Sequence, residues 1–336
     1  MMDRVGDLLT KAVLATALAC APVLLAAPAL AAAPEERLFT MDDPRITESS
    51  GLAVSPGHKG IYYTHNDSSA APEFFAVDSR GRTKAVFRIQ NAQARDWEAM
   101  AASTDPQTGR GVLWFADIGD NLDGAWPDIS VYKVTEPTTL RDGVVRAVRY
   151  RFKYSVGGRN AEGIMVDPRT GRLFVVSKEF AGAVYAAPRK LRTGRVNILR
   201  KVAEAPIMAT DAAYAPDGQS YVVRTYFSAT IFRPGGEMIT KVAMPQLKQA
   251  ESITFTPDGT SLLVGSEGVN SPVYRVPVPA RALSKPTASP KPAASASRVS
   301  DTAEAGRGLT AQDVLIWLGA AAGATGVIAF IARRSR

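Results

Sequence analysis

A unit that occurs five times between residues 48 and 268 constrains the fold of this chain more than any other feature. Each copy has an acidic residue, a short strand of alternating apolar positions, a turn rich in Pro, Asp and Gly, and a second apolar strand. Such turns join β-hairpins, and a repeat of 40 to 64 residues is typical of β-propeller blades. The acidic residues that open the copies are Glu48, Glu98, Glu162, Asp211 and Glu251.

The strands that follow in each copy predict how the ring closes. All five copies continue with a third strand, but the fifth copy lacks the fourth strand that the others have. The N-terminal segment Arg37–Asp43 belongs to no copy, so we expect it to complete the last blade. This pairing would close the ring and remove exposed sheet edges. The prediction is an all-β, five-bladed β-propeller, with room for a sixth, degenerate blade; a β-sandwich would not explain five matching units.

Each second strand ends in a polar cluster, of which Thr64–Asp67 is the first. In an antiparallel blade, the first strand begins at the end where the second strand stops. We therefore expect the acidic openings and the clusters to meet on one face around a central channel. The predicted ligand-binding face comprises Asn66, Asp67, Asp117, Asp120, Asn121, Lys178, Glu179, Arg224 and Tyr226. The predicted metal ligands are Glu48, Asp96, Glu98, Glu162, Asp211, Glu251 and Glu267.

Carboxylates that converge in this way repel one another and raise one another's pKa unless cations lie among them. Lys178 and Arg224 would neutralise part of this charge. Ca²⁺, which binds about six to eight oxygen ligands, would neutralise the rest and is the predicted cofactor. The alternative for any single residue is a structural bracket that hydrogen-bonds a turn between blades.

Other kinds of site have little support in the sequence. The chain has only two histidines, His58 and His65, and its single cysteine, Cys20, lies in an N-terminal apolar segment, so a zinc site is not expected. There is no G-x-S-x-G elbow, P-loop or dinucleotide fingerprint. Roughly +4 of the net charge of +8 falls on the body of the chain, which is too little to indicate nucleic-acid binding.

The N-terminus predicts export. Residues 1–31 contain basic residues, an apolar run and the small-x-small motif Ala29–Ala31, which together predict a signal peptide cleaved after Ala31. The predicted ectodomain then extends over residues 32–283.

The C-terminal segments predict a membrane anchor. A Pro/Ala/Ser-rich linker, residues 284–308, precedes the predicted anchor, residues 309–336. The apolar span Val314–Ala332 is long enough to cross a bilayer and is followed directly by a basic tail. We expect a single-pass protein of the cell membrane with an extracellular N-terminal domain and a cytoplasmic C-terminus. Gly319 and Gly323 form a G-x-x-x-G pair that would support at most a weak helix dimer.

Several motifs resemble a group of exported bacterial propellers related to the phytase-like (esterase-like activity of phytase) proteins. These motifs are ESSGLAVS…THNDS, DWEAMA, ADIGDN, AEGIMVD, RTY and ESITF…PDG…SEG, and they extend over about residues 45 to 275. In propeller phytases, carboxylates hold several Ca²⁺ ions, which bind the substrate phosphates and activate a water. The resemblance therefore implies a propeller with an acidic, Ca²⁺-binding face, although the basic residues that clamp phosphate in a phytase have no residue-by-residue match.

Three functions follow as hypotheses. The first is a surface-anchored propeller that binds an unknown small-molecule or protein ligand, with Ca²⁺, at its acidic face. The second is a Ca²⁺-dependent phosphoric-ester hydrolase in which Lys178 and Arg224 would hold phosphate and His65 or a carboxylate would move protons. The third is a metal-free scaffold that binds a protein partner through the propeller rim.

Overall fold

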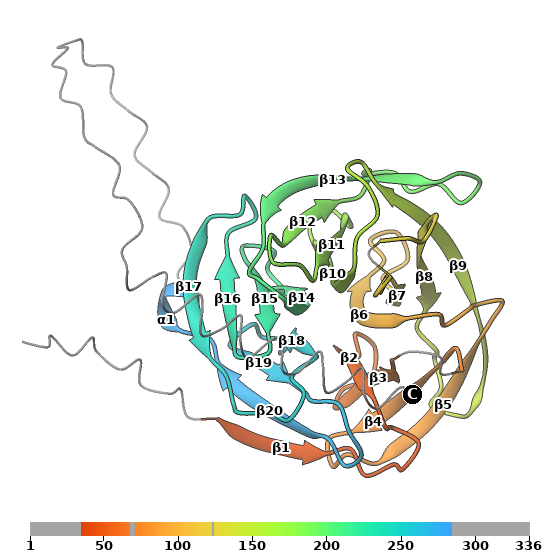
Figure 1. Ribbon diagram of the computed structural model, residues 1–336. Helices are drawn as coiled ribbons and strands as arrows, with labels where there is room; N and C mark the ends of the chain where they lie inside the picture. Colours follow the sequence, from red (N-terminus) through yellow and green to blue (C-terminus); the bar gives the residue numbers. More distant parts are fainter. Residues whose placement is uncertain (1–34, 68–70, 123, 284–336) are drawn as a thin grey trace, which may run out of the picture. The chain divides into compact units, whose positions relative to one another are not determined.

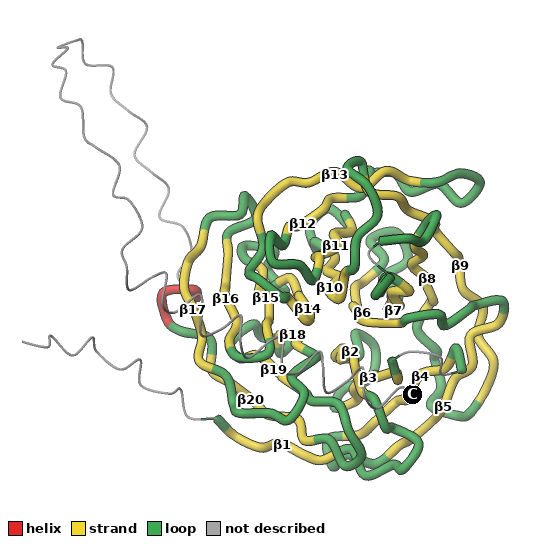
Figure 2. Tube along the Cα trace, viewed as in Figure 1, coloured by secondary structure: helices red, strands yellow, loops and turns green. Residues whose placement is uncertain are grey.

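The computed structural model describes residues 35–67, 71–122 and 124–283. Within these ranges the chain has twenty strands and one short helix, α1 (Ala280–Leu283). Figure 2 shows strands connected by loops over most of the described chain. The all-β prediction is therefore confirmed. The predicted signal peptide, linker and membrane anchor all lie outside these ranges. In the part of the chain that is described, no helix has the length and apolar character needed to span a membrane.

The strands form five antiparallel groups of four, which we call quartets 1 to 5 in chain order. Quartet 1 consists of β2 (Ser49–Val54), β3 (Ile61–Asn66), β4 (Glu73–Asp78) and β5 (Thr83–Gln90). Quartet 2 consists of β6 (Trp97–Thr104), β7 (Gly111–Asp117), β8 (Ile129–Thr135) and β9 (Gly143–Tyr154). Quartet 3 consists of β10 (Ala161–Val166), β11 (Leu173–Ser177), β12 (Ala183–Ala186) and β13 (Asn197–Glu204).

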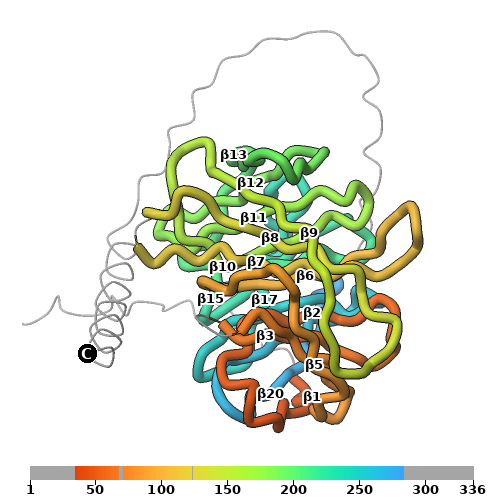
Figure 3. Tube along the Cα trace, turned by 90° about the vertical axis from the view of Figure 1, so that its right-hand side faces the viewer, coloured from red at the N-terminus to blue at the C-terminus, as the bar shows by residue number. Residues whose placement is uncertain are grey.

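Quartets 1 to 3 join into one twelve-stranded sheet because β9 pairs in parallel with both β5 and β13. The side view in Figure 3 shows β5 and β9 next to each other. Quartet 4 consists of β14 (Ala209–Tyr214), β15 (Tyr221–Thr225), β16 (Ser228–Phe232) and β17 (Met238–Ala243).

Quartet 5 combines the two ends of the described chain. It consists of β18 (Ile253–Phe255), β19 (Ser261–Val264), β20 (Pro272–Pro277) and the N-terminal β1 (Glu36–Thr40). β1 pairs antiparallel with β20, so the prediction that Arg37–Asp43 supplies the missing strand is confirmed. Phe39 and Met41 are buried, which adds apolar packing to the hydrogen bonds of this closure.

The first strands of the quartets lie innermost and surround a common centre, as Figure 1 shows. They contact one another in the order β2, β6, β10, β14, β18 and back to β2. The Pro/Asp/Gly turns between the first and second strands each place a glycine at positive φ, where a side chain would be strained. These glycines are Gly60, Gly109, Gly171, Gly218 and Gly259.

The described hydrophobic core consists of five clusters, one between each pair of neighbouring quartets, including quartets 5 and 1. Each sheet is therefore covered on both faces. A strand in this position should be apolar throughout, and every residue of β7 is buried. This explains why the second strand of each repeat forms a continuous apolar run, whereas the outer strand β9 alternates between buried or half-buried and exposed residues along much of its length.

Candidate functional site

The candidate site lies where the five inner strands begin, an end of the ring that we call the mouth. The opposite end is called the base. Contacts between residues at the starts of neighbouring strands fix this arrangement: Ser50 Oγ donates to Glu98 O, and Thr210 Oγ1 donates to Ala250 O at 2.9 Å. The second and fourth strands of a quartet end at the mouth, because alternate strands of an antiparallel sheet run in the same direction.

A β-bulge near the start of four inner strands determines which side chains reach the mouth. The pairing of the first and second strands skips one residue in quartets 1 to 4. A bulge redirects the side chain of its extra residue and is common next to functional sites. The skipped residues are Ser50, Glu98, Glu162 and Thr210.

The bulges correct the alignment of the repeat. Glu98 and Glu162 occupy equivalent bulge positions, but Glu48 precedes its bulge by two residues and Asp211 follows its bulge by one. Ser50 and Thr210 stand instead in those two quartets, and their hydroxyls bond the neighbouring backbone. The sequence pattern of an acid before an apolar strand therefore does not identify equivalent positions in all five copies.

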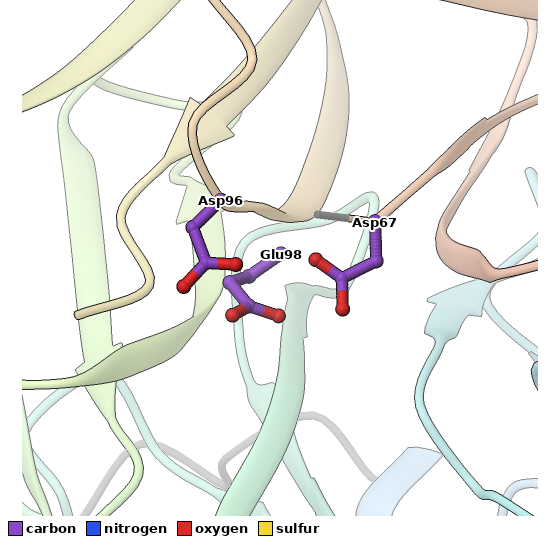
Figure 4. Close-up of side chains that lie close together, drawn as sticks. All are labelled: Asp67, Asp96 and Glu98. Carbon is purple, nitrogen blue, oxygen red and sulfur yellow. The ribbon is translucent and has the colours of Figure 1, made fainter. Parts of the chain in front are cut away.

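Three carboxylates form the tightest cluster at the mouth. Asp67 follows β3, Asp96 precedes β6, and Glu98 lies in β6, and each offers an oxygen within 4.8 Å of the other two. Figure 4 shows the three side chains grouped together. Asp96 and Glu98 are buried, with exposed fractions of 8% and 4%, while Asp67 is half-buried. We call these residues the carboxylate triad.

Gly119 belongs to this site and was missed by the sequence analysis. A Cβ at Gly119 would collide with Glu98 Oε1 and Asp96 Oδ2. The backbone N–H groups of Ile118 and Gly119 both donate to Asp96 O at 3.2 Å, which places the loop after β7 against the triad. The available signal was a glycine inside the acidic motif ADIGDN, since a glycine between polar residues often marks a close approach.

The triad is electrostatically strained. Burial raises the pKa of Glu98 well above its ordinary value, and the carboxylates of Glu162, Asp67 and Asp96 raise it further, while Lys178 lowers it. A buried negative charge is costly beside other negative charges unless a proton or a cation binds there. A proton or a cation bound at the triad would relieve this repulsion.

Lys178 is the ammonium group that bridges quartets 3 and 4 at the mouth. Its Nζ donates to the Glu162 carboxylate, and it also donates to Tyr226 Oη at 2.7 Å. Burial opposes its charge, but the Glu162 and Glu251 carboxylates outweigh burial and raise the pKa of Lys178. Burial raises the pKa of Glu162 to about 8 although Lys178 opposes the shift.

Two further carboxylates approach the mouth from quartet 5. Glu251 is buried and precedes β18, and burial is the main cause of its raised pKa. Glu267 follows β19, and burial together with Glu251, Asp67 and Glu48 raises its pKa to about 9. Gln249 Nε2 donates to the Glu267 carboxylate, a contact that no sequence signal indicated. The predicted convergence is therefore present for acids of quartets 1, 2, 3 and 5, with Glu48 contributing from an exposed position.

Arg224 and Asp211, predicted respectively as a ligand-binding residue and a metal ligand, are both fully buried. Arg224 Nη1 donates to Ser252 O at 2.7 Å, and burial lowers the pKa of this guanidinium to about 10. The Asp211 carboxylate accepts the N–H groups of Ala212 and Ile253 at 2.7 and 2.8 Å. These contacts tie quartet 4 to quartet 5, which corresponds to the structural bracket alternative.

His65 is also fully buried, with its ring edge-on to Trp97 and Phe115. Its Nδ1 lies 3.0 Å from the backbone oxygen of Asn66, and burial lowers its pKa to about 4. A side chain with no exposed surface and a neutral ring is poorly suited to exchange protons with a ligand at the mouth.

The other predicted ligand-binding residues mainly hold loops in place. Asp117 is buried and forms an ion pair with Arg95 at 2.9 Å, and it accepts the Asp96 N–H at 3.0 Å, so it positions the triad indirectly. Glu179 forms an ion pair with Arg159 at 2.8 Å.

The amide and carboxylate side chains of three further residues bond to nearby loops. Asn66 accepts the Thr47 and Glu48 N–H groups, Asp120 accepts the Trp126 N–H at 2.7 Å, and Asn121 Nδ2 donates to Asp96 at 3.4 Å.

The triad has the ligand type and the spacing that could hold a metal ion. Two oxygens that each lie about 2.4 Å from one ion are at most about 4.8 Å apart, the distance within which the triad oxygens lie. Carboxylate oxygens are the ligands that Ca²⁺ and Mg²⁺ prefer, and the larger Ca²⁺ tolerates irregular geometry better. Glu162 is already paired with Lys178, and Asp211 with backbone N–H groups, so neither is placed as a free ligand.

No protein-family model matches this chain, and no curated protein sequence matches it. The resemblance to phytase-like propellers therefore stays a prediction from the motifs.

Proposed function

We propose that residues 32–283 form a five-bladed β-propeller whose mouth binds a divalent cation, Ca²⁺ by preference, and through it an oxygen-rich ligand. The propeller part of this proposal is supported by the five quartets, the order of contacts among their inner strands, and the pairing of β1 with β20. Each quartet corresponds to one blade, and the five interfacial clusters account for the packing between blades.

The observation that carries the cation site is the carboxylate triad. Its three oxygens come from two neighbouring blades and lie within 4.8 Å of one another. One of them belongs to the buried Glu98, whose pKa is raised by burial and like charge. A cation would relieve this repulsion. Three protein ligands leave several positions of a Ca²⁺ ion for water or for oxygen atoms of a ligand. The ligand is therefore expected to carry carboxylate, phosphate or hydroxyl oxygens.

Isothermal titration with CaCl₂ tests this function. Wild-type protein should bind Ca²⁺, and Glu98→Gln should weaken the affinity at least tenfold because one charged ligand is lost. Lys84→Gln, an exposed change on β5, should leave the affinity unchanged. Tb³⁺ should compete for the site and be sensitised by Trp97, which lies between Asp96 and Glu98 in the chain. Equal Ca²⁺ affinity of wild type and Glu98→Gln would overturn the proposal.

A second candidate function, a scaffold that binds a protein partner, is favoured by the distribution of exposed apolar side chains. Within the described residues, six large apolar residues are exposed in loops at the mouth, whereas those exposed at the base lie in β9, β17 and α1. Exposed apolar residues mark an interaction surface where they gather into one contiguous patch. The six residues are Leu122, Val156, Phe180, Ile207, Phe227 and Val269.

Variants of the exposed loop residues and of the carboxylate triad distinguish the scaffold function from the cation-binding function. Crosslinking in native cells should trap a partner that is lost with the double variant Phe180→Ser, Phe227→Ser and kept with Glu98→Gln. The opposite pattern, loss only with Glu98→Gln, would assign the partner to the cation site and exclude the loops.

The hydrolase alternative is not part of this proposal. Of its named residues, His65 and Arg224 are fully buried and Lys178 is paired with Glu162 and Tyr226. Arg224 Nε and Nη2 have no hydrogen-bond partner, but both atoms are buried away from the surface, so Arg224 does not reach a phosphate at the mouth.

We propose that the protein is exported and is held at the cell membrane by its C-terminal segment, which lies outside the described residues.

A further inference from the structure

The outer wall of quartets 2 and 3 concentrates the positive charge of the protein. The outermost strands β9 and β13 pair in parallel, and the loop of residues 187–196 connects β12 to β13. We call residues 143–154 and 187–204 the basic band. They contain ten Lys and Arg and a single acid, Glu204, a net charge of +9, whereas the whole chain carries +8. The net charge of the chain therefore hides a strongly asymmetric distribution.

Most cations of the basic band have no acidic partner. Arg151 forms an ion pair with Asp128 at 3.4 Å, and Lys201 forms one with Glu204 at 2.7 Å. The other eight are exposed and form no ion pair within the part of the chain that the structure describes. Exposed charge of one sign repels itself and attracts an anionic partner.

The loop of the basic band is fixed against β9. Asn197 is buried, and its Nδ2 donates to Arg151 O at 3.1 Å and to Arg192 O at 2.9 Å, while its Oδ1 accepts the Arg192 N–H at 2.9 Å. A groove of about 500 Å³ lies between the loop and β9 and is lined by Tyr150 and residues 191–195. Four cations occur within seven residues of this loop: Arg189, Lys190, Arg192 and Arg195.

The two strands present further cations on their outer side. Arg149 and Lys153 are four residues apart in β9 and therefore point to the same side of the strand. Lys153 is paired directly with Ile198 of β13, and Arg200 lies two residues further along the same side. Leu199, between them, points the other way and is buried in the core between quartets 2 and 3. The cations of the strands and of the loop thus form one surface.

The basic band follows the curved edge of the ring. Figure 1 shows β13 and β9 one after the other along the outer circumference. A flat bilayer would touch a convex wall over only part of its length, whereas a flexible polymer can follow it. The loop also offers no exposed large apolar side chain for insertion into a bilayer, since Leu191 is half-buried against the core. The exposed aliphatic residues of the band lie in its strands: Val144, Val148, Ile198 and Val202.

The side chains of the basic band indicate the chemistry of this polymer. Six of the eight unpaired cations are Arg, whose planar guanidinium can donate two parallel hydrogen bonds to one phosphate. Single-stranded nucleic acid, by contrast, stacks its bases on exposed aromatic rings. The aromatic residues of the band are the half-buried Tyr150 and the buried Phe152 and Tyr154. A chain of phosphates without bases therefore fits the band best.

We propose that the basic band binds a linear polymer of phosphate groups along the outer wall of quartets 2 and 3. The binding is electrostatic and involves neither the carboxylate triad nor a cation at the mouth. It adds a polyanion-binding surface to a protein whose mouth is acidic.

Fluorescence anisotropy of labelled long-chain inorganic polyphosphate tests the proposal with the full-length protein in nonionic detergent. Chelator is present, so that no divalent cation can bridge the polymer to the triad. The affinity should fall at least about a hundredfold between about 50 and about 200 mM NaCl, because each neutralised phosphate releases a counterion. Tripolyphosphate, which is too short to extend along the band, should bind at least about tenfold more weakly than the long chain.

Removal of the loop cations should weaken binding. The quadruple variant Arg189→Gln, Lys190→Gln, Arg192→Gln, Arg195→Gln should bind at least about tenfold more weakly. The slope of log affinity against log salt concentration should fall in magnitude by about 3, since each lost contact contributes about 0.7.

A matched control removes the same charge outside the basic band. It replaces four exposed cations, Lys59→Gln, Lys241→Gln, Lys248→Gln and Arg281→Gln, and should bind polyphosphate as wild type does. Both quadruple variants should melt near the wild-type temperature, because none of the replaced side chains forms an ion pair with a described residue. Equal binding by wild type and the loop variant, or equal weakening in the control, would overturn the proposal.

Two comparisons separate other anionic partners. Doping the detergent micelles with phosphatidylglycerol should leave the polyphosphate affinity unchanged, and displacement of the polymer would assign the band to a lipid surface. Oligothymidylate with the same number of phosphates should bind no more tightly than polyphosphate, and tighter binding would assign the band to nucleic acid. Either result would overturn the proposal, as would the absence of polyphosphate binding to wild type.

Discussion

Lys178 Nζ donates to the Glu162 carboxylate in the mouth, and the two side chains are almost completely buried, with exposed fractions of 15% and 5%. Other carboxylates, among them Glu251 and Asp67, lie near this ion pair. Among the described residues, Lys178 is the cation that forms an ion pair with Glu162. A buried pair of this kind contributes little net stability, but removing one partner leaves an uncompensated charge.

At about pH 9, above the Glu162 pKa of about 8, replacement of Lys178 by methionine should therefore destabilise the fold by roughly 3 kcal/mol, because the ionised Glu162 carboxylate loses its buried partner. Urea denaturation of wild type and Lys178→Met measures the loss. The double variant Lys178→Met, Glu162→Gln should recover most of it, since no unpaired charge remains. A Lys178→Met protein as stable as wild type would mean that the pair contributes nothing to the mouth.

The stability of metal-free protein should fall as the pH rises from about 5 to about 9. The pKa of Glu162 is raised to about 8 and that of Glu267 to about 9, from an ordinary value of 4.5. A carboxyl group with a higher pKa in the folded state binds its proton more tightly there, so its contribution is present in full below 4.5 and is lost as the pH rises through the folded-state pKa.

Thermal melts in chelator across this pH range test the prediction. Glu267→Gln should flatten the decline, and Glu204→Gln, at the exposed end of β13, should not. A melting temperature that rises steadily towards pH 9 would contradict it.

Ca²⁺ should raise the melting temperature, because an ion that binds only the folded state stabilises it by RT ln(1 + [Ca²⁺]/Kd). At a hundred times Kd this is about 2.7 kcal/mol, which corresponds to roughly 5–10 °C for a domain of this size. Gly119→Ala should reduce the shift, since its Cβ would displace the Glu98 and Asp96 oxygens. Gly194→Ala, where a Cβ meets no atom within 4 Å, is the matched control. An undiminished shift in Gly119→Ala would place the ion elsewhere.

Closure by β1 predicts a strong effect of Phe39. This side chain is 6% exposed and packs in the cluster between quartets 5 and 1. Phe39→Ala should lower the free energy of unfolding by about 3 kcal/mol. It should also increase aggregation, because β1 would detach more often and expose the edge of β20. Differential scanning calorimetry and light scattering measure both effects. Glu36→Ala removes only an exposed ion pair with Arg275 and should leave both unchanged.

Deletion of Asp313–Arg336 should release the protein into the medium, because Val314–Ala332 is the predicted anchor. Fractionation of cells that express the truncated chain measures the distribution. Retention in the membrane fraction would point to the N-terminal segment, through lipidation of Cys20 or an uncleaved signal peptide, as the anchor.

The repeat in the sequence was sufficient to predict the strands and their order. Alternating or continuous apolar runs and Pro/Asp/Gly turns are local signals, and the resulting strands match those of the five quartets. The closing role of Arg37–Asp43 was also predictable, because the fifth copy lacked a fourth strand and the N-terminal segment belonged to no copy. Convergence of the acids followed from the alternation of strand direction in an antiparallel sheet.

What the sequence by itself determined is therefore the repeat, the strand order and the end of the ring at which polar residues gather. Only the tertiary structure decided which of those residues can bind a ligand. The bulges put Ser50 and Thr210 where Glu98 and Glu162 stand in other quartets. The Asp211 carboxylate is buried and accepts two backbone N–H groups, so it has a structural role. Asp67 of quartet 1 lies beside Glu98 of quartet 2. The physical reason is that strand alternation is encoded locally, whereas register, burial and the partners of a side chain depend on neighbours that are distant in the chain.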